Sequence, residues 1–109
     1  MASADDFRRL ALAFPGAEER AHMGHPDFRV GGKIFATLHA PDKGTGAVML
    51  LPEQQELAMA AEPASFSPAA GAWGRSGSTI ISLAEVSDEW LERVLNWAWA
   101  KRAPKALRG

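Results

Sequence analysis

The chain has 109 residues, of which 47% are hydrophobic and 23% are charged, and it contains no cysteine. This length suits one domain, and the lack of thiols excludes disulfides, thiolate metal sites and cysteine nucleophiles. A formal net charge of −1 argues against a strongly basic nucleic-acid-binding domain.

No targeting or membrane-spanning segment is predicted. Residues 1–6 contain neither a basic stretch nor a long apolar run, so they do not form a signal peptide. Nowhere do about eighteen apolar residues follow one another, as a membrane span requires. We therefore expect one cytoplasmic domain over residues 1–109, because a chain without cysteine suits a reducing compartment.

The first predicted element is a helix. Ser3 is suited to cap it, and Asp6, three residues later, is placed to complete a capping box. Pro15-Gly16 ends the helix, because proline does not continue the helical hydrogen bonds. Apolar residues lie between these signals at helical spacing: Phe7, Leu10, Ala11 and Phe14.

A β-hairpin is predicted around Gly31-Gly32, where two glycines supply the positive φ angles of a two-residue turn. This turn would pair Val30 with Lys33 and Phe28 with Phe35. The opposite face of the second strand would then carry Ile34, Ala36 and Leu38, and the pattern does not decide which face covers the core. A turn-rich loop at 41–46 leads into a third strand at 47–51.

The second half of the chain predicts a helix beginning at Pro52, a strand at 78–83 and a long helix capped by Ser87. Residues 62–77 are expected to form an irregular connection, in which Trp73 fills the edge of the core. The apolar side chains of the last helix cover an arc of roughly 200°, which indicates deep packing on a sheet. The order α-β(3)-α-β(1-2)-α predicts an α+β domain with a single antiparallel sheet of about four to five strands and the terminal helices packed on it.

No constellation of catalytic or metal-binding residues is recognised. His22, His25 and His39 suggest a zinc site, but strand residues three apart point to opposite faces. The segments 74–77 and 43–46 lack the spacing of a G-x-S-x-G nucleophile turn and of a phosphate-binding P-loop. We therefore expect a protein that is not an enzyme and that has no metal or other cofactor.

Several segments together resemble the MmcQ/YjbR family of small bacterial proteins. The matching motifs are the helix exit Pro-Gly-Ala-Glu-Glu at 15–19, the hairpin motif Lys-Ile-Phe-Ala at 33–36 and the ending Ala-Pro-Lys at 103–105. The resemblance covers about residues 5–107. It implies a compact α+β fold likened to frataxin-like and secretion-chaperone-like folds. It also implies the family's DNA-binding label, which derives from comparison with a double-wing motif, and it transfers no catalytic residue.

The distribution of charge suggests how DNA would be bound. Residues 93–109 carry a net charge of +5 and residues 20–43 a net charge of +2. Hairpin loops acting as wings, together with the basic C-terminal tail, would contact phosphates with little sequence preference. A solvated helix end is the simpler explanation of the basic tail. The candidate nucleic-acid-binding residues are Arg29, Lys33, Lys43, Arg75, Lys101, Arg102, Lys105 and Arg108.

The alternative is a protein–protein interaction adaptor or a homodimer that uses an apolar sheet face, such as Phe28, Val30 and Phe35. An exposed apolar patch of that size normally marks a partner surface. The two hypotheses differ in whether the basic loops and the tail share one surface.

Overall fold

The structure, a computed structural model, describes residues 2–39 and 44–108. In chain order the elements are α1 (Ala4–Leu12), β1 (Glu18–His22), β2 (His25–Val30), β3 (Lys33–Leu38), β4 (Thr45–Met49), α2 (Pro52–Ala61), β5 (Phe66–Pro68), α3 (Gly71–Arg75), β6 (Ser78–Ser82), α4 (Asp88–Arg102) and α5 (Lys105–Arg108). The described strands form one sheet in the order β1-β2-β3-β4-β6-β5, and all neighbours are antiparallel.

The predicted α+β class with a single antiparallel sheet and packed helices is confirmed. The sheet has six strands in the described residues because two short ones form its edges. β1 is exposed at all five positions, and β5 has only three residues, so neither carries the alternating pattern of a half-buried strand. The segment 62–77, predicted to be irregular, contains β5 and the short helix α3.

The N-terminal helix begins as predicted. The backbone N–H of Asp6 donates to the Ser3 hydroxyl, and the backbone N–H of Ser3 donates to the Asp6 carboxylate. Phe7 is fully buried, with its ring 5.7 Å from that of Phe28. The helix ends at Leu12 rather than at Phe14, and the Phe14 ring instead stacks on Trp99 at 5.6 Å.

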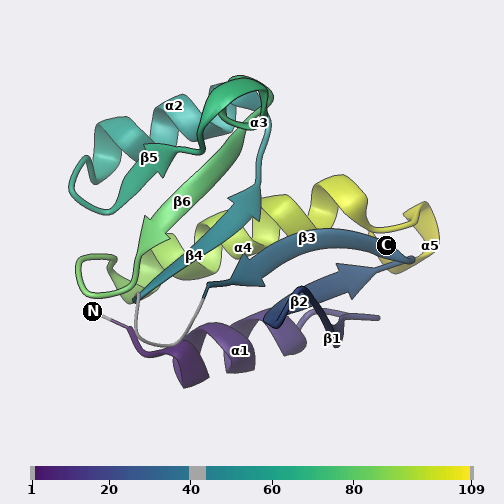
Figure 1. The fold of residues 1–109 in the computed structure, drawn as a ribbon. Coiled ribbons are helices and arrows are strands. Elements are labelled where there is room, and N and C mark those ends of the chain that lie inside the picture. Colours follow the sequence, from purple (N-terminus) through teal and green to yellow (C-terminus); the bar gives the residue numbers. More distant parts are fainter. Residues whose placement is uncertain (1, 40–43, 109) are drawn as a thin grey trace.

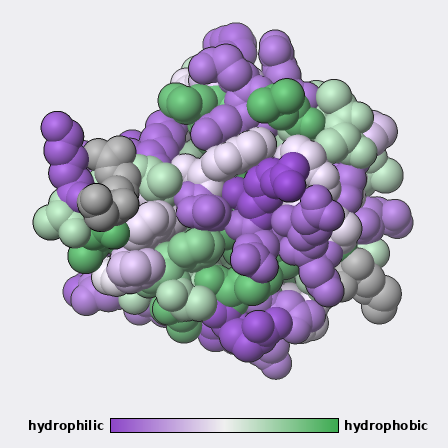
Figure 2. Space-filling model, turned by 180° about the vertical axis from the view of Figure 1, so that it is seen from behind, coloured by the Kyte–Doolittle hydropathy of each residue, from purple (hydrophilic) through white to green (hydrophobic). Residues whose placement is uncertain are grey.

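The long C-terminal helix covers the middle of the sheet. Ser87 caps it by accepting a hydrogen bond from the backbone N–H of Trp90. Its fully buried side chains pack with those of α1 and of the central strands in one core, so the two terminal helices cover the same face, as predicted (Figure 1). The outer side of this layer is mostly hydrophilic, with apolar side chains in separate groups (Figure 2). The buried residues of α4 that face the sheet are Leu91, Val94, Leu95 and Ala98.

The predicted hairpin between β2 and β3 forms at Gly31-Gly32, whose φ angles are +59° and +79°. Val30 pairs with Lys33, as predicted. A β-bulge then shifts the register between Phe28 and Arg29. Phe28 therefore lies opposite Ala36, and the predicted pairing of Phe28 with Phe35 is wrong.

The bulge changes which side chains share a face. Phe35 is the extra residue, so both Phe35 and Ala36 turn to the core and are fully buried. Ile34 and Thr37, three residues apart, then share the opposite face. The prediction that Ile34 and Ala36 lie on one face is wrong, because a strict period of two does not allow for an inserted residue.

The helix-covered face contains the apolar residues that were expected to form a partner surface. Phe28 and Phe35 are fully buried and Val30 is 1% exposed, all beneath the helices. An interaction surface made of these three residues is therefore wrong. The face that the helices leave uncovered is the other one.

Candidate functional site

The uncovered face of the sheet carries an apolar floor. β3 contributes Ile34, β4 contributes Ala47 and Met49, and β6 contributes Ile80, which lies opposite Ala47 in the register. Thr37 and Ser78 lie among them, and the Ser78 hydroxyl donates to the Met49 sulfur. The floor is therefore mostly apolar, with a few hydroxyl groups.

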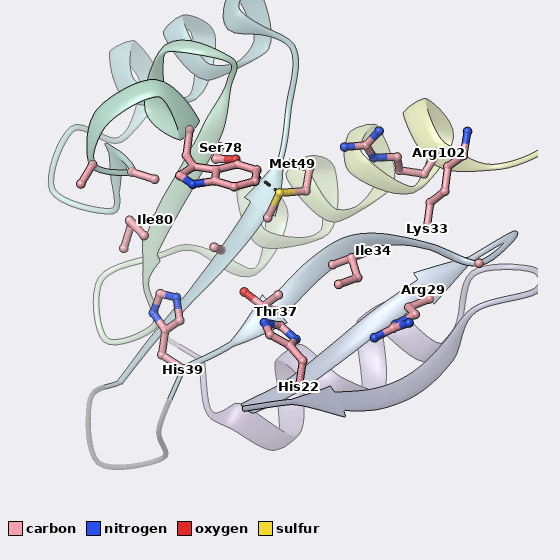
Figure 3. Close-up of a pocket in the computed structure, with 15 residues that line it drawn as sticks. His22, Arg29, Lys33, Ile34, Thr37, His39, Met49, Ser78, Ile80 and Arg102 are labelled. Atoms are coloured by element: carbon pink, nitrogen blue, oxygen red, sulfur yellow. Dashed lines mark hydrogen bonds between the residues drawn. The ribbon is translucent and has the colours of Figure 1, made fainter. Parts of the chain in front are cut away.

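This floor forms the base of an open groove with a volume of about 780 Å³. Cavities of this size, mostly apolar and with a few polar groups, are typical of ligand-binding sites. Figure 3 shows histidine, arginine and lysine side chains from several strands and from α4 around the floor. The polar or aromatic side chains at its margin are His22, Arg29, Lys33, His39, Trp73 and Arg102.

Two cations meet at one end of the groove. Lys33 begins β3 directly after the glycine turn, and Arg102 is the last residue of α4. The turn approaches the end of α4 closely, since a Cβ added at Gly31 would lie 3.1 Å from the Pro104 ring. Within residues 2–39 and 44–108, neither Lys33 nor Arg102 forms an ion pair. The groove end therefore presents positive charge that no carboxylate of the described chain neutralises.

Arg102 also has a hydrogen-bond donor without an acceptor in the described residues. Its Nε is buried and has no hydrogen-bond partner in the described part of the chain. Buried polar groups are normally paired, and an unpaired one needs a specific explanation. No group of the described chain therefore holds the Nε of Arg102 in place.

Arg29 is the third cation at the groove, and it is paired. Its Nε and Nη2 donate to the fully buried Asp27 carboxylate at 2.8 and 3.1 Å, and Nδ1 of His22 lies 2.7 Å from the same carboxylate. The hydrogen bonds from Arg29 hold the pKa of Asp27 below its ordinary value, against the opposing effect of burial. The same contact raises the pKa of Arg29. This pair is therefore part of the scaffold beneath the groove.

Trp73 lies at the groove margin and is 73% exposed. The prediction that it fills the edge of the core is therefore wrong. Its helix, α3, packs tightly against the preceding segment, since a Cβ added at Gly74 would lie 1.9 Å from the carbonyl oxygen of Ala69. Only glycine permits this approach, so the exposed indole is carried on a closely packed support.

The three histidines lie near the sheet end opposite the glycine turn, but they do not form a metal site. His22 contacts Asp27, and Nδ1 of His39 lies 2.7 Å from the Thr45 hydroxyl. The rings of His25 and His39 meet edge to face at 6.5 Å. Among the residues that the structure describes, no group of three or more His, Asp or Glu side chains is arranged to hold a metal ion.

The structure divides the predicted cationic residues into separate groups. Arg29, Lys33 and Arg102 line the groove, and the exposed Lys105 follows in α5. Lys101 donates to the Leu50 carbonyl oxygen at 3.2 Å, and burial together with the charge of Arg102 lowers its pKa. Arg75 is exposed on α3 outside the groove lining. Lys43 and the side chain of Arg108 lie outside the described residues.

Of the hairpin loops predicted to act as wings, the structure describes the glycine turn at Gly31-Gly32, whereas residues 40–43, including Lys43, lie outside the described residues. The glycine turn approaches the chain just after α4, so this loop and the C-terminal end of α4 lie close together (Figure 1).

These features define a class of protein: an α+β domain with one antiparallel sheet, the two terminal helices on one face and an open groove on the other. A model of the YjbR family matches residues 12–101, and the chain belongs to this family. The resemblance to MmcQ/YjbR proteins is therefore confirmed. No helix in the described part of the chain is long and apolar enough to cross a membrane.

The fold also occurs in a solved structure. The crystal structure of Deinococcus radiodurans protein DR2400, with a DUF419 domain, is similar to this chain with a TM-score of 0.76 and 21% sequence identity. The similarity covers 99% of this chain and 86% of the Deinococcus chain. No curated protein matches the chain. At this level of identity, the comparison supports the fold alone.

Proposed function

We propose that this YjbR-family chain is a non-enzymatic module that binds nucleic acid weakly, through phosphate groups held at the cationic end of the groove. The observation that carries the proposal is the pairing state of Lys33 and Arg102. Both line the groove without an ion-pair partner in the described residues, and the buried Nε of Arg102 lacks an acceptor. Phosphate oxygens are acceptors of the kind that an arginine fork binds best.

Few phosphates are bound, so the affinity is low. Arg29 is committed to Asp27 and Lys101 to the Leu50 carbonyl, which leaves Lys33, Arg102 and Lys105 as the main contacts. The whole chain carries a net charge of −1, which opposes long-range attraction of a polyanion. Binding through phosphates alone carries little sequence preference.

A fluorescence anisotropy titration with labelled DNA at 50 and 200 mM salt tests the proposal. For about three phosphates of a DNA duplex, we expect affinity to fall by roughly fortyfold over this range. K33Q/R102Q should weaken binding at 50 mM salt and flatten the salt dependence. The charge-matched control R9Q/R93Q changes two cations on the helix-covered side and should behave like the unmodified chain.

Two outcomes would contradict the proposal. The first is an absence of binding at 50 mM salt with tens of micromolar protein. The second is an equal loss of affinity in K33Q/R102Q and in the control variant. If no DNA binds and the chain forms a concentration-dependent dimer that Ile80→Glu disrupts, the apolar floor is instead a contact between protein chains.

A further inference from the structure

The proposed function leaves one feature of the groove unused, because phosphate contacts require no aromatic side chain. Trp73 is the most exposed tryptophan of the chain, and it borders the same apolar floor as Met49 and Ile80. A large aromatic surface beside unpaired cations is the combination that sequence-tolerant proteins use to bind single strands. Bases stack on the ring, and the backbone follows the positive charge.

We infer that the ligand of the groove is single-stranded nucleic acid, with a base stacked on Trp73 and the adjoining backbone phosphate held by Lys33 and Arg102. This inference rests on the proposed function and names the form of nucleic acid that it takes. The close packing of α3 at Gly74 fixes the backbone that carries the indole, so binding has to order the Trp73 side chain but not its helix.

The shape and polarity of the groove favour a single strand over a duplex. In a duplex the base faces are stacked inside, so only phosphates and groove edges reach a protein surface. Cavities of about 780 Å³ are typical sites for drug-sized ligands. The groove therefore accommodates about one or two unstacked nucleotides. The hydroxyl groups of Thr37 and Ser78 lie on the floor, where the edge of a stacked base would meet them.

The arrangement also explains why both parts of the site are needed. Stacking contributes affinity that does not depend on salt, whereas the two cations contribute the salt-dependent part. A chain with a net charge of −1 gains little from long-range attraction, so the aromatic contact carries a large share of the binding.

The test compares a labelled 12-nucleotide oligothymidylate with a 12-base-pair duplex, using the full chain at 50 mM salt. We expect the single strand to bind at least fivefold more tightly. W73A should weaken single-strand binding by about fivefold to a hundredfold and leave duplex binding unchanged. W73F should retain most of the affinity, because phenylalanine also stacks. The matched control L57A removes an exposed apolar side chain of α2, outside the groove, and should change nothing.

Tryptophan fluorescence gives a second measurement. The exposed indole should be quenched when the single strand binds, and W73F should lose this quenching while it still binds in the anisotropy experiment. Trp99 is buried, and Trp90 and Trp97 contact each other on α4, away from the groove lining. These three residues should therefore contribute little to the signal.

The outcomes separate this inference from the proposed function. If K33Q/R102Q weakens binding but W73A does not, or if the duplex binds as well as the single strand, the nucleic-acid function stands and the inference is wrong. If neither nucleic acid binds, both are wrong. If thymidine monophosphate binds as tightly as the 12-mer, the site takes a free nucleotide, and the inference of a strand is overturned.

Discussion

Neighbouring residues of the same strands form the two faces of the sheet, but the two faces differ in polarity. The covered face is a continuous apolar layer in which Phe28 and Phe35 are fully buried beneath two helices and pack in one core with Phe7 of α1. The open face combines aliphatic side chains with a buried carboxylate and unpaired cations. One face maximises the apolar area removed from water, which is the dominant stabilising contribution in folding. The other retains two cations without ion-pair partners in the described residues, Lys33 and Arg102, which folding alone does not explain and which are typical of binding sites.

The largest effect on stability is expected from a comparison of two neighbouring isoleucines of β6, one on each face of the sheet. Ile81 is fully buried on the covered face, whereas Ile80 is half-buried on the groove floor. We expect Ile81→Ala to lower the free energy of unfolding by about 2–5 kcal/mol, because it leaves a cavity in the core. Ile80→Ala should cost about 1 kcal/mol or less, since the groove is already open to solvent. Urea denaturation of both variants measures the difference, and equal costs would mean that the open face is covered in solution.

An intermediate effect on stability is expected for Asp27, the buried carboxylate of the open face. Asp27 accepts hydrogen bonds from Arg29 and contacts His22, so Asp27→Ala should cost roughly 1–3 kcal/mol. The pKa of Asp27 is lowered in the folded state. Its contribution to stability is therefore fully present above the unfolded-state pKa of about 4 and is lost as the pH falls through the lower folded-state value.

Urea denaturation at several pH values checks this expectation. The unmodified chain should lose stability below about pH 4 more steeply than Asp27→Ala. Two parallel pH profiles would show that the carboxylate is not linked to folding in this way.

The smallest effect on stability is expected at Arg102, where the effect on binding should be large. Its buried Nε has no partner in the described residues, so Arg102→Met removes an unpaired donor and retains an apolar stem. We expect the free energy of unfolding to change by less than about 1 kcal/mol, or to rise, while DNA binding at 50 mM salt is weakened. A thermal melt combined with the anisotropy titration measures both quantities. A large loss of stability would assign Arg102 a structural role instead.

The two covering helices and the glycine turn could be predicted from the sequence, because they depend on local signals, whereas the choice of the covered face could not. The capping residues Ser3 and Ser87, the helical spacing of apolar residues and the Gly31-Gly32 turn each act within a few positions of the chain. The bulge could not be predicted, because no local pattern marks Phe35 as the extra residue. The exposed position of Trp73 was also missed, because it depends on the fit of α3 against Ala69.

The site could be predicted only in part. Three of the predicted cations, Arg29, Lys33 and Arg102, line one groove, and the basic character of these two segments was the signal that identified them. The sequence did not indicate that Arg29 is already paired with Asp27, or that Lys101 points to the Leu50 carbonyl oxygen. Such pairings depend on strand register and on contacts between residues distant in the chain.

The two edge strands have a consequence for self-association. A free sheet edge normally offers unpaired backbone groups to another chain, and it is the usual starting point for aggregation. Here one edge carries Glu18, Glu19 and Arg20, all exposed, and the other is three residues long and ends at Pro68, which has no backbone N–H to donate. Both are recognised ways of preventing a further strand from adding. Both edges therefore disfavour the addition of a strand from another chain, which leaves the open face, with its apolar groove, as the more accessible part of this sheet.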